Sequence, residues 1–309
     1  MPIGVLLSVA VVAEGVIAAP GGGEQAAGRG DSQLFIGVVL LLALIAAGLI
    51  IRFGWFRLGA APARPKLLAP EVALALALAM FILAPIAWLA ARVVWGIELP
   101  GAVEGGAADP LPLHLQAKQA LAACTGQAVI ALIYAGRLAS SRAASPDRRA
   151  SGAKAGLVAL AAFALVWPVT VCVGWLVSSV AECFGYRPPG AIAHETLRLL
   201  MHSPRDGWFV AMVLVVLLAV PILEELFYRG LLQEAMVRIG AGRWPAVVLS
   251  SMVFAAMHWA NTAPHAVASL FVLSLGFGWA YERTGRLTAS IAMHMFFNVA
   301  NLAVALATQ

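Results

Sequence analysis

Two adjacent glutamates at the end of a long apolar run are the first side chains of this chain that could do acid–base chemistry. Glu224 and Glu225 follow the run GWFVAMVLVVLLAVPIL, and Arg229 lies four residues after Glu225. Residues i and i+4 share a helix face, so Glu225 and Arg229 can form an ion pair while Glu224 points about 100° away. This pattern fits a fixed carboxylate beside a second one that is available as a general base. It fits equally well a charged helix end at a membrane surface.

Two later apolar segments each contain a histidine at a helical spacing from a second side chain. His258 follows Phe254 by four residues, and His294 precedes Asn298 by four. A lone histidine on an apolar helix is usually a hydrogen-bonded packing residue. Here two carboxylates, two histidines and an asparagine fall within the last third of the chain. In lipid such groups must face inward and find partners, so we expect them to meet.

The composition requires a membrane around much of the chain. Hydrophobic residues make up 62% of the 309 residues and charged residues 11%, against about 25% charged residues in soluble domains. The mean hydropathy is +0.90. These values exclude a soluble enzyme, a collagenous chain, a disordered tail and a disulfide scaffold. The net charge of +5 does not indicate a nucleic-acid partner, because basic loops orient membrane proteins in the lipid bilayer.

Apolar runs of about 20 residues predict the membrane-spanning helices. Residues 1–19, interrupted by Glu14, are either a weak span or a signal-like segment, and a flexible linker follows. We therefore predict an all-α, polytopic transmembrane helix bundle with eight or nine spans. The eight clear runs occupy residues 34–51, 70–95, 117–135, 156–181, 207–223, 244–261, 264–281 and 287–307.

Fourteen of the 20 basic residues lie in alternate loops, which predicts that these loops face the cytoplasm. We expect an integral protein of a bacterial plasma membrane. The fourteen residues are Arg52, Arg57, Arg64, Lys66, Arg137, Arg142, Arg148, Arg149, Lys154, Arg229, Arg238, Arg243, Arg283 and Arg286.

The turn signal Gly240-Ala241-Gly242 predicts a helical hairpin. Glu224 precedes Ala241 by 17 residues and His258 follows it by 17, so both lie at one depth if the two helices have equal rise. The helix that carries Glu224 continues through the charged stretch 229–243. We therefore expect the site to lie within the membrane and to open toward the cytoplasm.

Taken together, the patterns EExxxR at 224–229, FxxxH at 254–258 and HxxxN at 294–298 resemble the CPBP family. These are intramembrane endopeptidases typified by the type II CAAX prenyl proteases, with bacterial relatives linked to bacteriocin processing and self-immunity. The resemblance covers residues 207–305. It suggests a division into an N-terminal weak span or signal-like segment with linker, an N-terminal helical membrane region and a CPBP-like catalytic helix bundle. These occupy residues 1–33, 34–200 and 201–309.

The resemblance implies hydrolysis of a peptide bond in a membrane-associated protein or peptide. Glu224 and His258 would bind and activate the attacking water, and Glu225 and Arg229 would form a supporting pair. His294 and Asn298 would complete the site, as a further ligand or by stabilising the oxyanion. Glu224, His258 and His294 form a plausible zinc set, but a metal-free mechanism with glutamate as the base is equally open. We expect the other five of these side chains to line one polar cavity within the membrane, and Arg229 to close this cavity on its cytoplasmic side.

Other classes of function also use intramembrane polar groups. A membrane transporter or proton relay would do so, although no matching polar set occurs in the first half of the chain. A catalytically idle membrane scaffold or immunity protein is a second alternative. The segment His194-Glu195-Thr196-Leu197-Arg198 begins like HExxH but has Arg in place of the second His, which argues against a zincin. We expect His114, His194, His202 and His265 to lie outside the site.

Overall fold

The computed structural model describes seven stretches of the chain. These are residues 28–54, 57–59, 67–97, 111–144, 151–185, 195–259 and 262–307. Helices dominate all but the shortest of them, and no β-strand occurs in the described residues, which confirms the all-α class. The expected segment at residues 1–19 lies outside the described residues.

The helices follow the predicted apolar runs closely. They are α1 (Gly28–Arg52), α2 (Pro70–Trp95), α3 (Leu113–Ala144), α4 (Gly152–Cys183), α5 (Glu195–His202), α6 (Gly207–Leu214), η2 (Val215–Ala219), α7 (Val220–Glu225), η3 (Leu226–Gln233), α8 (Glu234–Arg238), α9 (Arg243–His258), α10 (Pro264–Thr284) and α11 (Leu287–Ala307). The five elements from α6 to α8 form one continuous helix, in which η2 and η3 are π-helical.

Within the described residues, five helices are long and apolar enough to cross a membrane, so the predicted eight or nine spans are not confirmed. Helix α9 has 16 residues, or roughly 24 Å at 1.5 Å per residue, against a hydrocarbon core of about 30 Å. Helix α10 is long enough, but it contains polar residues such as Ser274 and Glu282. The five spans are Pro70–Trp95, Leu113–Ser141, Gly152–Cys183, Gly207–Arg238 and Leu287–Leu306.

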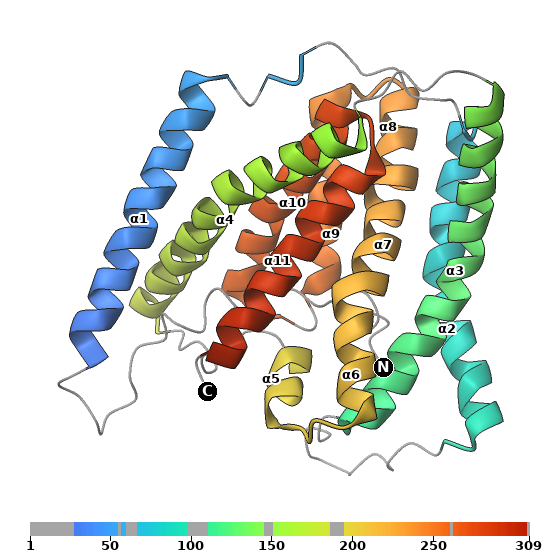
Figure 1. The fold of residues 1–309 in the computed structure, drawn as a ribbon, viewed down its shortest axis with the longest axis horizontal. Helices are drawn as coiled ribbons and strands as arrows, with labels where there is room; N and C mark the ends of the chain where they lie inside the picture. Colours follow the sequence, from blue (N-terminus) through green and yellow to red (C-terminus); the bar gives the residue numbers. More distant parts are fainter. Residues whose placement is uncertain are drawn as a thin grey trace.

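The last third of the chain forms the centre of the bundle (Figure 1). Helices α7, α9, α10 and α11 lie in the middle, α4 packs against α10 and α11, and α1 packs on α4 at one edge. Helices α2 and α3 pair at the opposite edge. The C-terminal ends of α1, α3, α8 and α10, which adjoin the predicted basic loops, share the upper end in Figure 1. Their assignment to the cytoplasmic side stays a prediction.

The core and the outer surface are both apolar. Tyr228, Phe254, Phe277 and Phe297 belong to a fully buried cluster between η3, α9, α10 and α11, against which α4 also packs. Large apolar side chains such as Leu132, 73% exposed, cover the outside of the bundle. An apolar outer surface of this extent would be unstable in water and is what a lipid bilayer requires.

Proline explains one of the two π-helical stretches. Pro221 lies inside the continuous helix, has no N–H and would clash with the carbonyl group four residues earlier. Just before it, the Val220 N–H donates to the carbonyl of Val215, five residues back, which is the π-helical pattern. The bulge therefore lets the helix continue through the proline to the paired glutamates.

Helices α2 and α3 approach closely at one glycine. A Cβ atom added to Gly126 would lie 2.7 Å from the Leu83 carbonyl oxygen and 2.8 Å from the Ala87 Cβ. Both distances are shorter than van der Waals contact, and one of them involves backbone. The pair α2–α3 therefore depends on the absence of a side chain at this position.

We expect Gly126→Ala to lower the free energy of unfolding by about 1–3 kcal/mol through overpacking. Gly136→Ala is the matched control on the same helix, because an added Cβ there meets nothing within 4 Å. This control should be neutral or slightly stabilising, since Ala favours a helix over Gly. Unfolding by SDS titration in mixed micelles measures both variants. Equal stability of the two variants would contradict the close approach.

Candidate functional site

Three helical segments bring the predicted side chains into the interior. Glu224 and Glu225 are the last two residues of α7, and Arg229 lies in η3. His258 is the last residue of α9, and His294 and Asn298 lie in α11. All six side chains are buried, with exposed fractions between 0% and 3%. Buried polar groups in such surroundings must find partners.

Glu225 is the centre of the contacts among these residues. Its Oε1 accepts hydrogen bonds from Nη1 of Arg229 and from Nδ1 of His294, each at 3.0 Å. The ion pair with Arg229 confirms the i,i+4 pattern. The bond to His294 was not predicted, because the two residues are 69 positions apart and no spacing rule connects them. One carboxylate oxygen thus joins two helical segments.

Arg229 also forms hydrogen bonds with α10. Its Nη2 donates to the carbonyl oxygen of Ser274 at 2.9 Å and to the hydroxyl of the same residue. The rings of Phe254 and Phe277 each lie 5.3 Å from the guanidinium carbon, at a cation–π distance. Arg229 therefore anchors Glu225 from a fully buried position, and its predicted closure of a polar cavity stays a prediction. Sequence reasoning missed Ser274, since an isolated serine in an apolar helix gives no signal.

His294 lies between the two glutamates. Because the Glu225 carboxylate accepts, Nδ1 of His294 is the donor, so in the neutral form of the ring Nε2 carries the lone pair. This Nε2 lies 4.0 Å from Oε2 of Glu224. The ring stacks on Phe277 with 4.8 Å between centroids and 18° between planes, which fixes its orientation.

His258 is fixed in a similar way. Its Nδ1 lies 2.7 Å from the carbonyl oxygen of Phe254, and since a carbonyl only accepts, Nδ1 is the donor and Nε2 carries the lone pair. The Phe254 ring lies 4.4 Å from the His258 ring and 6.1 Å from the His294 ring. Phe254 thus contacts both imidazoles. The predicted bridge between Glu224 and His258 stays a prediction.

Several polar atoms of the site lack a protein partner. Within the described part of the chain, no hydrogen bond reaches either side-chain oxygen of Glu224, Oε2 of Glu225 or Oδ1 of Asn298. Asn298 donates through Nδ2 to the carbonyl of Val216 in η2, at 2.9 Å. Buried oxygens without donors are costly and call for a ligand such as water, an ion or a substrate.

A second buried polar cluster continues from Arg229 along η3 and α10. Gln233 donates to Glu282 at 2.8 Å and accepts from Ser250 at 3.2 Å. Arg243 donates to Glu282 at 2.6 Å and to the carbonyl of Gly59 at 2.9 Å. This cluster ties η3, α9 and α10 together beside the site. The sequence does not predict this cluster, because Gln233, Arg243 and Glu282 lie outside the apolar runs and resemble charged helix ends.

The remaining expectations have mixed outcomes. His114 and His202 are exposed, His194 lies outside the described residues, and His265 is buried at the start of α10. Two cavities, one beside η3 and α3 and the other between α4 and α10, are lined by other residues than the six of the site. In the described residues no group of three or more His, Cys, Asp or Glu is placed to hold a metal ion.

Removing the Ser274 hydroxyl should weaken the anchor of Arg229. We expect Ser274→Ala to lower the free energy of unfolding by about 1.5–3 kcal/mol, the range for hydrogen bonds to charged groups. Ser269→Ala on the same helix removes a buried bond to the Thr170 carbonyl, a neutral partner, and should cost about 0.5–1.5 kcal/mol. Denaturant titration in mixed micelles compares them. A smaller loss for Ser274→Ala than for Ser269→Ala would contradict the anchor.

Comparison with known proteins finds a family model that matches the segment around the site. Residues 206–300 match the protein-family model described as Rce1-like, type II CAAX prenyl endopeptidase Rce1-like. No curated protein and no solved structure matches the chain. The matched segment runs from Asp206, whose side chain caps α6, to Ala300 in α11 and contains all six site residues. Segment 206–300 is therefore similar to the type II CAAX prenyl endopeptidases of the Rce1-like family, as the three motifs predicted.

Proposed function

We propose that this protein is an intramembrane endopeptidase that hydrolyses a peptide bond of a membrane-associated protein or peptide, with Glu224 as the general base. The main support for this proposal is that two adjacent carboxylates differ in their hydrogen-bond partners. Glu225 is bonded to Arg229 and His294, whereas Glu224 has no hydrogen-bond donor within the described part of the chain. The match to a protease family supports the reaction class.

The two glutamates have different tasks in this proposal. Oε1 of Glu225 accepts two bonds, one of them from a guanidinium that stays protonated, so Glu225 orients its neighbours. Glu224 keeps both oxygens available. A water that donates to Glu224 would lose its proton to this carboxylate as it attacks the carbonyl carbon of the peptide bond. The carboxyl group so formed can then protonate the leaving amine.

The two histidines present lone pairs while their other nitrogens are fixed. One Nδ1–H is bonded to a carboxylate and the other to a backbone carbonyl. These are the partners that orient metal-binding histidines. The donor chemistry therefore suits zinc, which Glu224, His258 and His294 would hold and which would polarise the water and the peptide carbonyl. Within the described residues these side chains do not surround a common point, so binding would require side-chain rotation.

Asn298 retains one N–H for the reaction. Its amide nitrogen carries two hydrogens, and one is bonded to the Val216 carbonyl. The second can donate to the oxyanion of the tetrahedral intermediate. The π-helical segment η2 supplies that carbonyl, so the bulge before the paired glutamates also orients Asn298.

A proton relay is less well supported than hydrolysis. The hydrogen bonds that connect Glu225 to α10 pass through Arg229. A guanidinium does not release its proton in proteins, so it interrupts a chain of proton transfers. No observation in the described residues favours transport over hydrolysis.

Glu224→Gln should lower cleavage by about 10²–10⁴-fold, the usual contribution of a general base, with little change in the free energy of unfolding. Glu225→Gln should destabilise the protein by about 3–5 kcal/mol, because it leaves Arg229 buried without its carboxylate. The exposed Glu71→Gln is the control for both measurements. Labelling of new protein N-termini in membranes with wild-type or Glu224→Gln protein measures cleavage. Undiminished cleavage by Glu224→Gln would refute the mechanism.

Zinc content separates the two forms of the mechanism. About one zinc per chain in the purified protein, lost in His258→Ala together with activity, would support the metal form. An active protein without bound zinc, unaffected by chelators, would support glutamate alone.

A further inference from the structure

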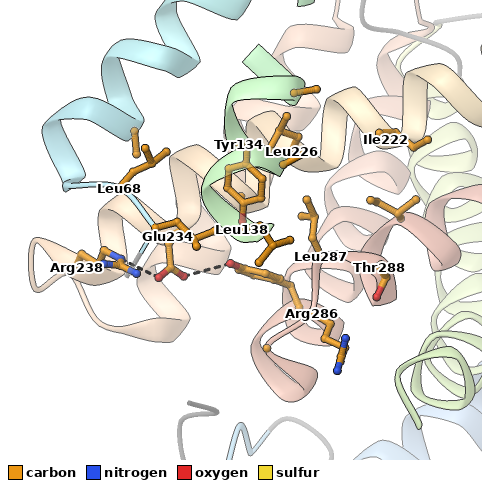
Figure 2. A pocket seen from close by; sticks show the side chains of 18 residues that line it. Leu68, Tyr134, Leu138, Ile222, Leu226, Glu234, Arg238, Arg286, Leu287 and Thr288 are labelled. Carbon is orange, nitrogen blue, oxygen red and sulfur yellow. Dashed lines mark hydrogen bonds and ion pairs between the residues drawn. The ribbon is translucent and has the colours of Figure 1, made fainter. Parts of the chain in front are cut away.

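A cavity of about 220 Å³ lies against η3, and none of the six site residues lines it (Figure 2). Leu226 and Gly230 form part of its wall and follow Glu225 and Arg229 by one residue each. The other walls come from the start of α2, the end of α3 and the turn between α10 and α11. The cavity and the site thus share one helix but no lining residue.

The lining of this cavity is mostly apolar. Figure 2 shows Tyr134, Ile222, Leu226 and Leu287 around it. Gly230 keeps the space open, since an added Cβ would lie 3.0 Å from Leu226 Cδ1 and 3.6 Å from both Leu287 Cδ2 and Tyr134 Cε2. Larger side chains at this position would extend into the cavity.

The same cavity has a charged end. Glu234 accepts hydrogen bonds from Arg238 at 2.8 Å and from the Tyr281 hydroxyl at 3.2 Å. Arg286 also lines the cavity, so its three charged side chains carry a net charge of +1. In Figure 2 Glu234, Arg238 and Arg286 lie in the lower half of the view, below Ile222 and Leu226. The charge favours an anion at this end.

The cavity borders the apolar outer surface of the bundle. Ile222 lines it and is 42% exposed. Its walls include three of the membrane-spanning helices, Pro70–Trp95, Leu113–Ser141 and Gly207–Arg238. A molecule dissolved in the bilayer can therefore enter without crossing water, with its polar end at the level of the helix ends.

We propose that this cavity binds an anionic amphiphile with an acyl chain. The chain occupies the apolar part beside Gly230, and the anionic head group lies near Arg238 and Arg286. Fatty acids and anionic phospholipids share this chemistry. Because no residue of the hydrolytic site lines the cavity, binding can be tested without measuring proteolysis.

The test uses cis-parinaric acid, a fluorescent fatty acid, and its uncharged methyl ester, titrated into the purified full-length protein in detergent. Ala135→Phe and Thr288→Phe fill the cavity from two exposed lining positions, so at least one variant should fold. Leu132→Phe is the control on α3, since Leu132 does not line the cavity. Thermal unfolding verifies that each variant is folded.

We expect saturable binding of the acid by the wild type and by Leu132→Phe, and an affinity about tenfold or more lower in the filled variants. Arg286→Gln should weaken the acid about tenfold and leave the ester unchanged, since only the acid carries a charge. Non-saturable partitioning, or equal affinity in the filled variants, would overturn the site. Equal weakening of acid and ester by Arg286→Gln would overturn the anionic head group. The mass of a co-purified adduct in native mass spectrometry distinguishes fatty acid from phospholipid.

Discussion

The structure depends on one buried ion pair and the histidine attached to it. Charges removed from water cost several kcal/mol each, and Glu225 and Arg229 are both fully buried. The cost is offset because the guanidinium also bonds Ser274 and contacts aromatic rings, while the carboxylate also bonds His294. These contacts connect η3 to α10 and α11. The same contacts leave Glu224 as the carboxylate without a donor in the described part of the chain, so stability and reactivity have one origin.

The π-helical segments determine how these groups meet. Eight residues of η3 lie between Glu225 and the turn before α9, so the equal helical rise assumed for the two sides of the hairpin does not hold. The proline-induced bulge in η2 contains Val216, and the carbonyl of Val216 accepts a hydrogen bond from Asn298 across the helix interface. Such bulges are often found at functional sites because they re-aim side chains that a regular helix would point elsewhere.

Short-range sequence patterns predicted the main helices and one ion pair, but not the contacts between residues far apart in the chain. The i,i+4 rule predicted the bond between Glu225 and Arg229, and the apolar runs predicted the main helices. The length of α9 could not be read from its run, because the helix ends at His258, before the apolar residues do. Ser274 and Gln233 give no local signal, since their roles depend on contacts 45 residues away. The span number is not confirmed, because hydropathy alone does not show which polar residues of an apolar helix pack inward.

The central claim is that Glu224 activates a water and does not itself attack the peptide bond. Once a substrate is identified, a single turnover in water enriched in oxygen-18 tests this most directly. Mass spectrometry then measures the label in the new C-terminal carboxylate and in the enzyme peptide that contains Glu224. The account predicts one heavy oxygen in the product and none in Glu224. Label in the Glu224 carboxylate would indicate an acyl-enzyme intermediate and contradict the account.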